Sequence, residues 1–93
     1  MSTKEPKKKI KFIPYRPVGS KREYSNYVEV TKSMLDVSIK FCDVKPPENI
    51  EELQQVQKTG LLKIPIVTEV VLPLAIARAF LDALRTQMEK ENK

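Results

Sequence analysis

Apolar and polar residues alternate through residues 24–41, in two runs separated by a short break at residues 32–34. Side chains of a strand point to opposite faces in turn, so each run predicts a strand with one apolar face. The apolar positions of the two runs are Val28, Val30, Val37, Ile39 and Phe41. The two strands predict an antiparallel hairpin. Its turn type stays open, because the break lacks the Asn-Gly or Asp-Gly pair that fixes a tight turn.

The middle of the chain predicts a further strand and one less defined segment. Residues 48–60 are polar, with Ile50, Leu53 and Val56 at three-residue spacing and a glycine at the end, which fits a short helix or an ordered loop equally well. Residues 61–71 are rich in β-branched side chains and predict a third strand. Pro65 lacks an N–H, so this strand is expected at a sheet edge or beside a bulge.

The C-terminal segment predicts a long amphipathic helix. Pro73 suits the first turn of a helix, and neither glycine nor a second proline follows it before about Glu91. Large apolar residues recur every four positions at Ile76, Phe80, Leu84 and Met88. Charged residues occupy the other side at Arg78, Asp82, Arg85 and Glu89. One face is therefore expected to pack and the other to face solvent.

A second stripe on this helix consists of alanines, at Ala75, Ala79 and Ala83. Small residues in a row let another backbone approach closely, so we predict a subunit interface formed by these alanines together with Phe80. A negative charge at Ala79 is then expected to give a folded monomer. The alternative is that alanine is the best helix former and fills a tight place against the domain's own sheet. The sequence leaves both open.

These elements define an α+β domain over residues 23–93, preceded by a basic arm at residues 1–22. The expected fold is a small antiparallel sheet of about three strands packed against one long C-terminal helix. The arm holds three prolines and one glycine among its charges and is expected to be disordered in isolation.

Three stretches give the chain a family resemblance: Tyr24-Ser25-Asn26 before the first strand, residues 35–41, and residues 73–88. In this order they resemble a family of small prokaryotic domains of unknown function that begin with Tyr-Ala-Asn or Tyr-Ser-Asn. In that family the C-terminal helix starts with Ser-Pro-Glu, whereas Leu72 and Leu74 flank the proline here. The helix start therefore lacks the family's side-chain cap. The resemblance implies the α+β fold and no established activity.

Charge is divided unevenly along the chain. The net charge is +5, but residues 1–22 carry eight basic residues against one acidic residue, while the remainder carries nine against eleven. This asymmetry indicates an interaction tail attached to a mildly acidic domain. The arm residues predicted to contact a partner protein or nucleic acid are Lys7, Lys8, Lys9, Lys11, Phe12, Tyr15 and Arg16. A third reading is that the arm only keeps the chain soluble.

Composition narrows the setting and the chemistry. A chain of 93 residues with one cysteine and no histidine predicts one domain without an intrachain disulfide, in a reducing compartment. No apolar run reaches the length of a membrane span or a signal peptide core, so we expect a soluble cytoplasmic protein without a membrane partner. A lone core of this size is marginal, and dimerisation is the expected remedy.

Catalytic and metal-binding signals are weak. Histidine, the usual proton carrier near neutral pH, is missing, and the two glycines stand too far apart for a phosphate-binding loop. Cys42 lies at a strand end near Lys40 and Lys45, where it is either an exposed thiol or an inert filler. We therefore expect no enzyme activity, small-molecule substrate, cofactor or metal. The sequence favours a homodimeric protein-interaction or assembly subunit whose basic arm orders on a larger partner. The alternative is a nucleic-acid-binding protein that uses the lysine-rich arm.

Overall fold

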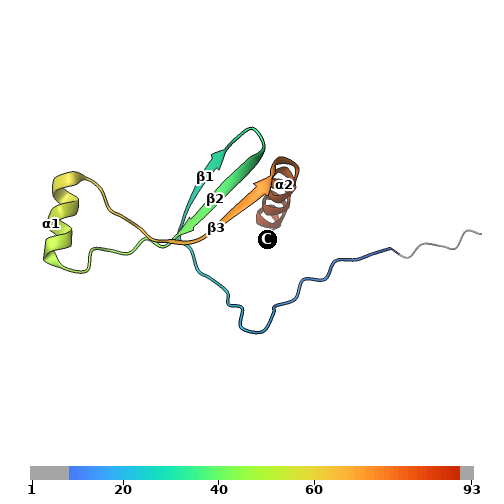
Figure 1. Ribbon diagram of the computed structural model, residues 1–93, viewed down its shortest axis with the longest axis horizontal. Helices are drawn as coiled ribbons and strands as arrows, with labels where there is room; N and C mark the ends of the chain where they lie inside the picture. The colour runs from blue at the N-terminus through green and yellow to red at the C-terminus, as the bar shows by residue number, and fades with distance from the viewer. Residues whose placement is uncertain (1–8, 91–93) are drawn as a thin grey trace, which may run out of the picture.

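The computed structural model describes residues 9–90 and confirms the α+β architecture (Figure 1). Its elements follow the order β1 (Tyr27–Lys32), β2 (Asp36–Cys42), α1 (Ile50–Thr59), β3 (Ile66–Pro73) and α2 (Leu74–Glu89). Residues 9–26 form neither helix nor strand and run away from the sheet. Lys7 and Lys8 lie outside the described residues. Among residues 9–90, no helix is both long and apolar enough to cross a membrane.

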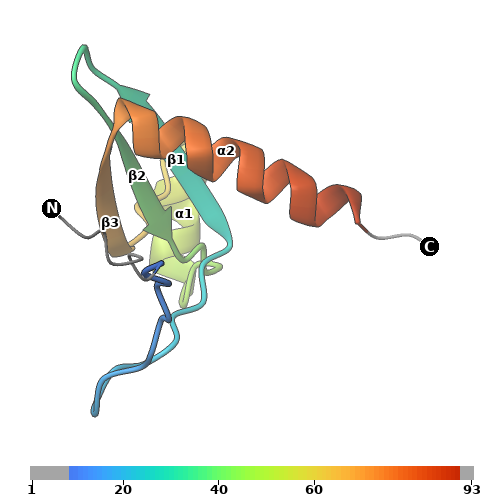
Figure 2. The same ribbon diagram turned by 90° about the vertical axis from the view of Figure 1, so that its right-hand side faces the viewer.

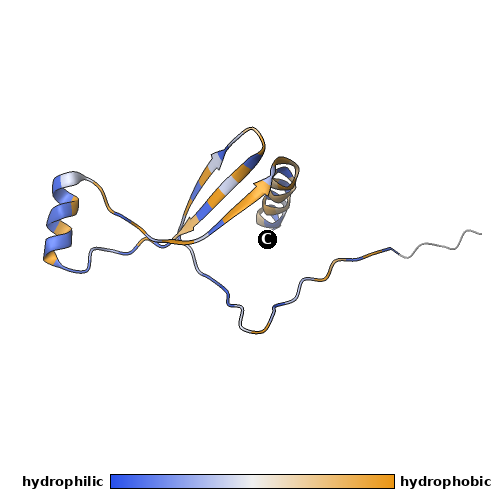
Figure 3. Ribbon diagram, viewed as in Figure 1, coloured by the Kyte–Doolittle hydropathy of each residue, from blue (hydrophilic) through white to orange (hydrophobic). Residues whose placement is uncertain are grey.

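The three strands form one antiparallel sheet in the order β1-β2-β3. Its central row pairs Val30 with Ile39 and Ile39 with Val70, so the predicted apolar positions of the hairpin share one face. Because directly paired residues point to the same side, the remaining apolar positions of this face follow from the register. They are Val28, Val37, Phe41 and Leu72. In Figure 3, β1 and β2 accordingly alternate between hydrophobic and hydrophilic residues.

The centre of the opposite face of the sheet is polar. Glu29, Lys40 and Glu69 form one row across the three strands. Lys40 Nζ lies 3.8 Å from Glu29 Oε1, and Ser38 Oγ donates a 2.8 Å hydrogen bond to Glu69 Oε2. Exposed pairs of this kind contribute little stability, about 0–1 kcal/mol. Their main effect is to fix which face of the sheet meets solvent.

Ser33 organises the turn between β1 and β2, which the sequence left open. Its Oγ accepts hydrogen bonds from the N–H groups of Leu35 (3.2 Å) and Asp36 (3.1 Å). Its own N–H donates to the Asp36 carbonyl at 2.8 Å. A serine hydroxyl that satisfies backbone groups two and three residues ahead replaces the positive-φ residues of an Asn-Gly turn.

The polar segment after β2 forms a helix. Of the two structures that the sequence allowed for it, a short helix and an ordered loop, the helix is therefore correct. Asn49 is its N-cap, and its Oδ1 accepts a 2.8 Å hydrogen bond from the N–H of Glu52. Gly60 ends the helix with φ 72°, a left-handed conformation that glycine adopts without steric cost, and its N–H donates to the Val56 carbonyl at 2.7 Å. The sequence had indicated Gly60 but not the Asn49 cap.

The last two elements follow each other without a loop. β3 was predicted over residues 61–71 but begins at Ile66, directly after Pro65, and ends at Pro73. It is an edge strand, as expected, with a register irregularity opposite Phe41 and Cys42. α2 begins at Leu74 after Pro73, whose ring offers no hydrogen bond to the helix start, as the Leu-Pro-Leu sequence implied. Figure 2 shows α2 starting beside β3, crossing in front of the sheet and extending beyond β1.

Candidate protein-interaction surface

An apolar groove of about 480 Å³ lies between the sheet and α2. The sheet side of this groove includes Val28 and Val30 of β1 and Phe41 of β2. The helix side is formed mainly by Phe80, Leu81 and Leu84. Lys32 and Arg78 are its charged lining residues. The groove arises because α2 crosses the sheet obliquely and leaves the β1 side of the apolar face open.

The interior of the described chain is very small. Within residues 9–90, the buried hydrophobic residues are Ile39 and Cys42, with 5% and 4% of their surface exposed. By contrast, the groove residues Val30 and Phe80 expose 60% and 43%. Full burial of such a side chain contributes about 1.5–3 kcal/mol, so each half-exposed residue forgoes roughly half of this stabilisation. The apolar sides of the sheet and of α2 thus resemble the two layers of a hydrophobic core, but within one chain these layers stay partly exposed to solvent.

Exposure rises along the face of α2 that lines the groove. Leu74 and Ala77, in the first half, are partly buried against the sheet. Leu81 and Leu84 expose 53% and 46%, and Met88 exposes 71%. These five residues follow a three-then-four spacing and therefore lie on one side of the helix. The same apolar stripe is covered where α2 packs on β2 and β3 and is open to solvent from the groove onward.

Of the residues predicted to form an oligomer interface, only one lines this groove. Phe80 lines it. Ala75, Ala79 and Ala83 are exposed, and they fall outside the lining residues. An apolar helix flank thus does remain uncovered, as the sequence indicated, but its uncovered large residues are Leu81, Leu84 and Met88. The role of the three alanines in an interface stays a prediction.

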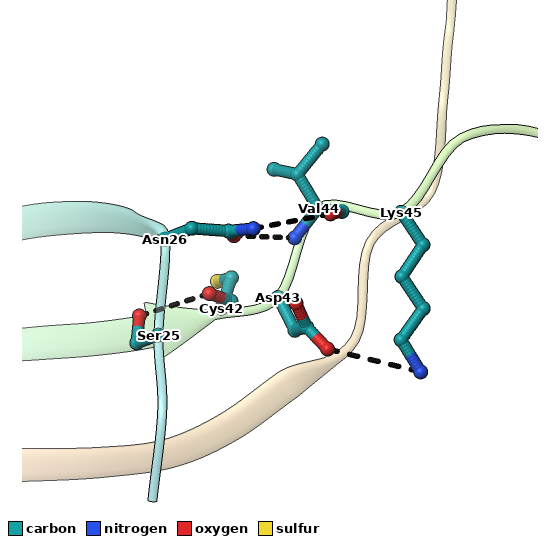
Figure 4. Close-up of polar contacts among 6 residues, drawn as sticks. All are labelled: Ser25, Asn26, Cys42, Asp43, Val44 and Lys45. Atoms are coloured by element: carbon teal, nitrogen blue, oxygen red, sulfur yellow. Dashed lines mark hydrogen bonds and ion pairs between the residues drawn. The ribbon is translucent and has the colours of Figure 1, made fainter.

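Polar contacts close the end of the sheet at which β1 begins (Figure 4). Ser25 Oγ donates a 2.9 Å hydrogen bond to the Cys42 carbonyl. The Asn26 side chain bonds the Val44 backbone twice: Oδ1 accepts from the N–H at 2.6 Å, and Nδ2 donates to the carbonyl at 3.2 Å. The Asn26 side chain therefore makes the two hydrogen bonds that the backbone of one further residue pair would make in the sheet.

The burial of Cys42 decides between the two interpretations of this residue. The thiol is buried, so the interpretation as an exposed reactive cysteine is wrong, and the cysteine fills space at the strand end. Sequence reasoning treated Ser25 and Asn26 as family markers and missed their structural role. The available signal was a pair of short polar side chains just before a strand, a position where they readily bond backbone groups.

The described part of the basic arm is highly exposed. Phe12 and Tyr15 expose 90% and 82% of their surface, and Lys9, Lys11 and Arg16 are exposed as well. A turn with the Ser20 N–H donating to the Pro17 carbonyl at 3.0 Å interrupts the extended chain. These side chains are presented to solvent, which is compatible with any of the roles that the sequence left open for them.

Helix α1 forms a second unpartnered element. Among the described residues, it contacts none of the other helices and strands, and Figure 1 shows it far from the sheet. Ile50 and Leu53 of its apolar side expose 70% and 43%. The backbone hydrogen bond from the Asp43 N–H to the Pro65 carbonyl, 3.1 Å, ties the two connecting segments together beside the sheet.

Candidate catalytic and metal-binding groups are not gathered into a site within residues 9–90. In that range, no three or more of the side chains of Asp, Glu, Cys or His are placed to hold a metal ion together. The described acidic residues are instead distributed over the polar sheet face, the connecting segments and the two helices.

Comparison with protein-family models, with curated proteins and with solved structures gives no match.

Proposed function

We propose that the protein is a non-enzymatic interaction or assembly subunit that acts as a homodimer and engages a larger partner through its basic arm. The observation that carries the proposal is the open apolar groove between the sheet and α2. Its lining is overwhelmingly apolar, and its volume is about 480 Å³. Covering such a surface with protein is favourable, because water released from apolar walls is the main driving force of association.

Two further features support a binding role. The arm presents exposed aromatic and basic side chains, and α1 extends an apolar side to solvent away from the sheet. Aromatic and arginine side chains, such as those of the arm, are enriched at protein interfaces, and Tyr and Arg are frequent among the residues that carry most of the binding energy. Each feature depends on a partner for its burial.

Nucleic acid binding is the second candidate function, and the exposed side chains of Phe12 and Tyr15 beside Lys9 and Lys11 favour it. Basic residues displace counterions from phosphates, and exposed aromatic rings can stack on unpaired bases. If about five basic arm residues contact duplex DNA, log affinity falls against log salt with a slope of about −4 to −5. Deletion of residues 1–22 then abolishes binding. Affinity retained by the truncated chain contradicts this function.

The test of the homodimer uses the variant Leu84→Glu. Leu84 lies in the groove and is 46% exposed, so the substitution places a charge on the apolar surface with little effect inside the monomer. The expected result is a dimer for the native chain and a folded monomer for the variant. Mass is measured by light scattering over a range of concentrations, and folding by circular dichroism.

Gln54→Glu is the matched control, because it adds the same charge to the polar side of α1, one turn before Lys58. This variant is expected to remain a dimer. Ala79→Glu separately tests the alanine flank, for which the sequence predicts a folded monomer. A native chain with the 10.7 kDa mass of a monomer at all concentrations contradicts the homodimer.

A further inference from the structure

Helix α2 is much longer than its own sheet is wide. The outer strands of three lie about 10 Å apart, since neighbours are about 4.8 Å apart. The 16 residues of α2 extend about 24 Å. Figure 2 shows the consequence: the helix starts beside β3, crosses the sheet and continues beyond the edge of β1. Within the described residues α2 contacts β3 and β2 but not β1, so its C-terminal part projects past the strands on which it packs.

A sheet with twice as many strands is as wide as α2 is long. Six strands extend about 24 Å from first to last, which is the length of α2. Two copies of the three-stranded sheet make such a sheet if they join at β1, the edge over which the helix projects. A two-fold axis at this junction turns the second helix antiparallel to the first. The second helix then ends above the first copy's sheet.

The exposure of the helix stripe follows this division. Leu74 and Ala77, above the chain's own sheet, are partly buried, whereas Leu81, Leu84 and Met88 are exposed. On the apolar face of the sheet, the most exposed apolar residues are those of β1, where Val28 and Val30 expose 50% and 60%, against 38% for Val70 of β3. The uncovered half of the helix and the uncovered strand are thus complementary in chemistry and in position.

We propose that the groove is filled by the C-terminal half of α2 from a second copy, with the two β1 edges joined into one six-stranded sheet. Leu81, Leu84 and Met88 of each copy lie on the β1 side of the other copy's apolar sheet face. This inference rests on the proposed homodimer and assigns its geometry. It differs from the alanine-centred interface expected from the sequence in that the groove stripe contacts the partner's sheet, while Phe80 and Ala83 meet between the two helices.

Charge and strand length select the register of the joined edges. A two-fold axis at Glu29 places two like charges directly opposite each other, which is unfavourable. An axis at Val28 pairs little more than the first half of β1. An axis at Val30 pairs residues 28–32, sets Glu29 opposite Thr31, and sets Val28 opposite Lys32. The proposed dimer therefore has the two Val30 residues facing each other.

The same axis places the two helices side by side over the junction. Ile76, Phe80 and Ala83 lie on one flank of α2, because they are spaced by four and three residues. This flank contains Phe80, which lines the groove. The axis passes near the middle of the helix, between Phe80 and Ala83, so the ring of one copy lies opposite the small alanine of the other. A large residue against a small one permits close helix packing.

The test is disulfide formation by single cysteine variants of the full chain. Opposed residues of an antiparallel pair have Cα atoms about 4.5–5.5 Å apart, within the range of a disulfide. Val30→Cys is therefore expected to form a covalent dimer under mild oxidation at least about 10-fold faster than Val28→Cys. Val28 is the matched control on the same face, since its two copies are about 14 Å apart along the strand. The native Cys42 is buried.

Two further variants separate the alternatives. Val70→Cys on β3 reports on joining at the other sheet edge, and faster crosslinking there overturns the proposal. Leu84→Glu combined with Val30→Cys is expected to lose the crosslink, because the helix no longer fills the partner's groove. A crosslink that persists in this double variant overturns the assignment of the groove.

Light scattering of the native chain distinguishes failure of this geometry from failure of the proposed function. A native dimer whose Val30→Cys variant crosslinks no faster than Val28→Cys keeps the homodimer and overturns the β1 junction. A monomeric native chain overturns both. Circular dichroism of each variant confirms that the substitution, at an exposed position, leaves the fold intact.

Discussion

The substitution Asn26→Ala tests whether the contacts before β1 hold the sheet end closed. It removes two hydrogen bonds between the Asn26 side chain and the Val44 backbone, of 2.6 and 3.2 Å. A hydrogen bond contributes about 0.5–1.5 kcal/mol net, and both of these are solvent-exposed, so we expect the lower half of that range for each. The free energy of unfolding should then fall by about 1–2 kcal/mol.

The assay is thermal unfolding followed by circular dichroism at one fixed protein concentration, because the stability of a dimer depends on concentration. For a domain of this size a loss of 1 kcal/mol lowers Tm by about 4–8 °C. Asn49→Ala is the matched control: it also removes an asparagine bond to a backbone N–H, but in α1, which contacts none of the other described helices and strands.

Asn49→Ala is therefore expected to leave the main transition in place. Equal Tm values for Asn26→Ala and the native chain would show that the sheet end does not depend on this side chain. A drop in Tm for Asn49→Ala as large as that for Asn26→Ala would show that α1 is coupled to the sheet, against the structure.

The remaining predictions concern the small interior and α1. Ile39→Ala is expected to lower the free energy of unfolding by about 2–4 kcal/mol, because Ile39 is 5% exposed in the centre of the sheet, and denaturant titration measures the loss. Cys42 should react with a thiol reagent in native buffer far more slowly than in denaturant, since it is 4% exposed, and equal rates would contradict its burial. Asn49→Ala is expected to weaken the N-terminal turn of α1 by about 1 kcal/mol, visible as faster amide exchange confined to that helix.

Strands and helices could be predicted from the sequence where the spacing of apolar side chains and the backbone preferences of the residues indicate the same structure. The alternation at Val28, Val30, Ile39 and Phe41 indicated the hairpin and its apolar face, and the register confirms it. Pro73 and the four-residue spacing of large residues placed the start of α2 to within one residue, since Pro73 is the N-cap and the helix begins at Leu74. The turn at Ser33 was not predictable, because a single hydroxyl that bonds two N–H groups leaves no distinctive residue pair.

The candidate site was predictable in kind and less so in detail. The excess of apolar surface on α2 indicated an uncovered face, but attention to the alanines missed Leu81, Leu84 and Met88, whose exposure depends on the length of the helix relative to the sheet. The open β1 side of the groove could not be foreseen, since it depends on the direction in which α2 crosses the strands.

The sequence by itself determined the hairpin and the C-terminal helix and which side of each is apolar, because these properties depend on the spacing of neighbouring side chains. It also determined the separation of charge between the arm and the domain. The tertiary structure decided that α1 stands apart, that Cys42 is buried and that the apolar face stays half open. Those properties depend on how distant segments meet, and the spacing of residues within one segment does not specify that meeting.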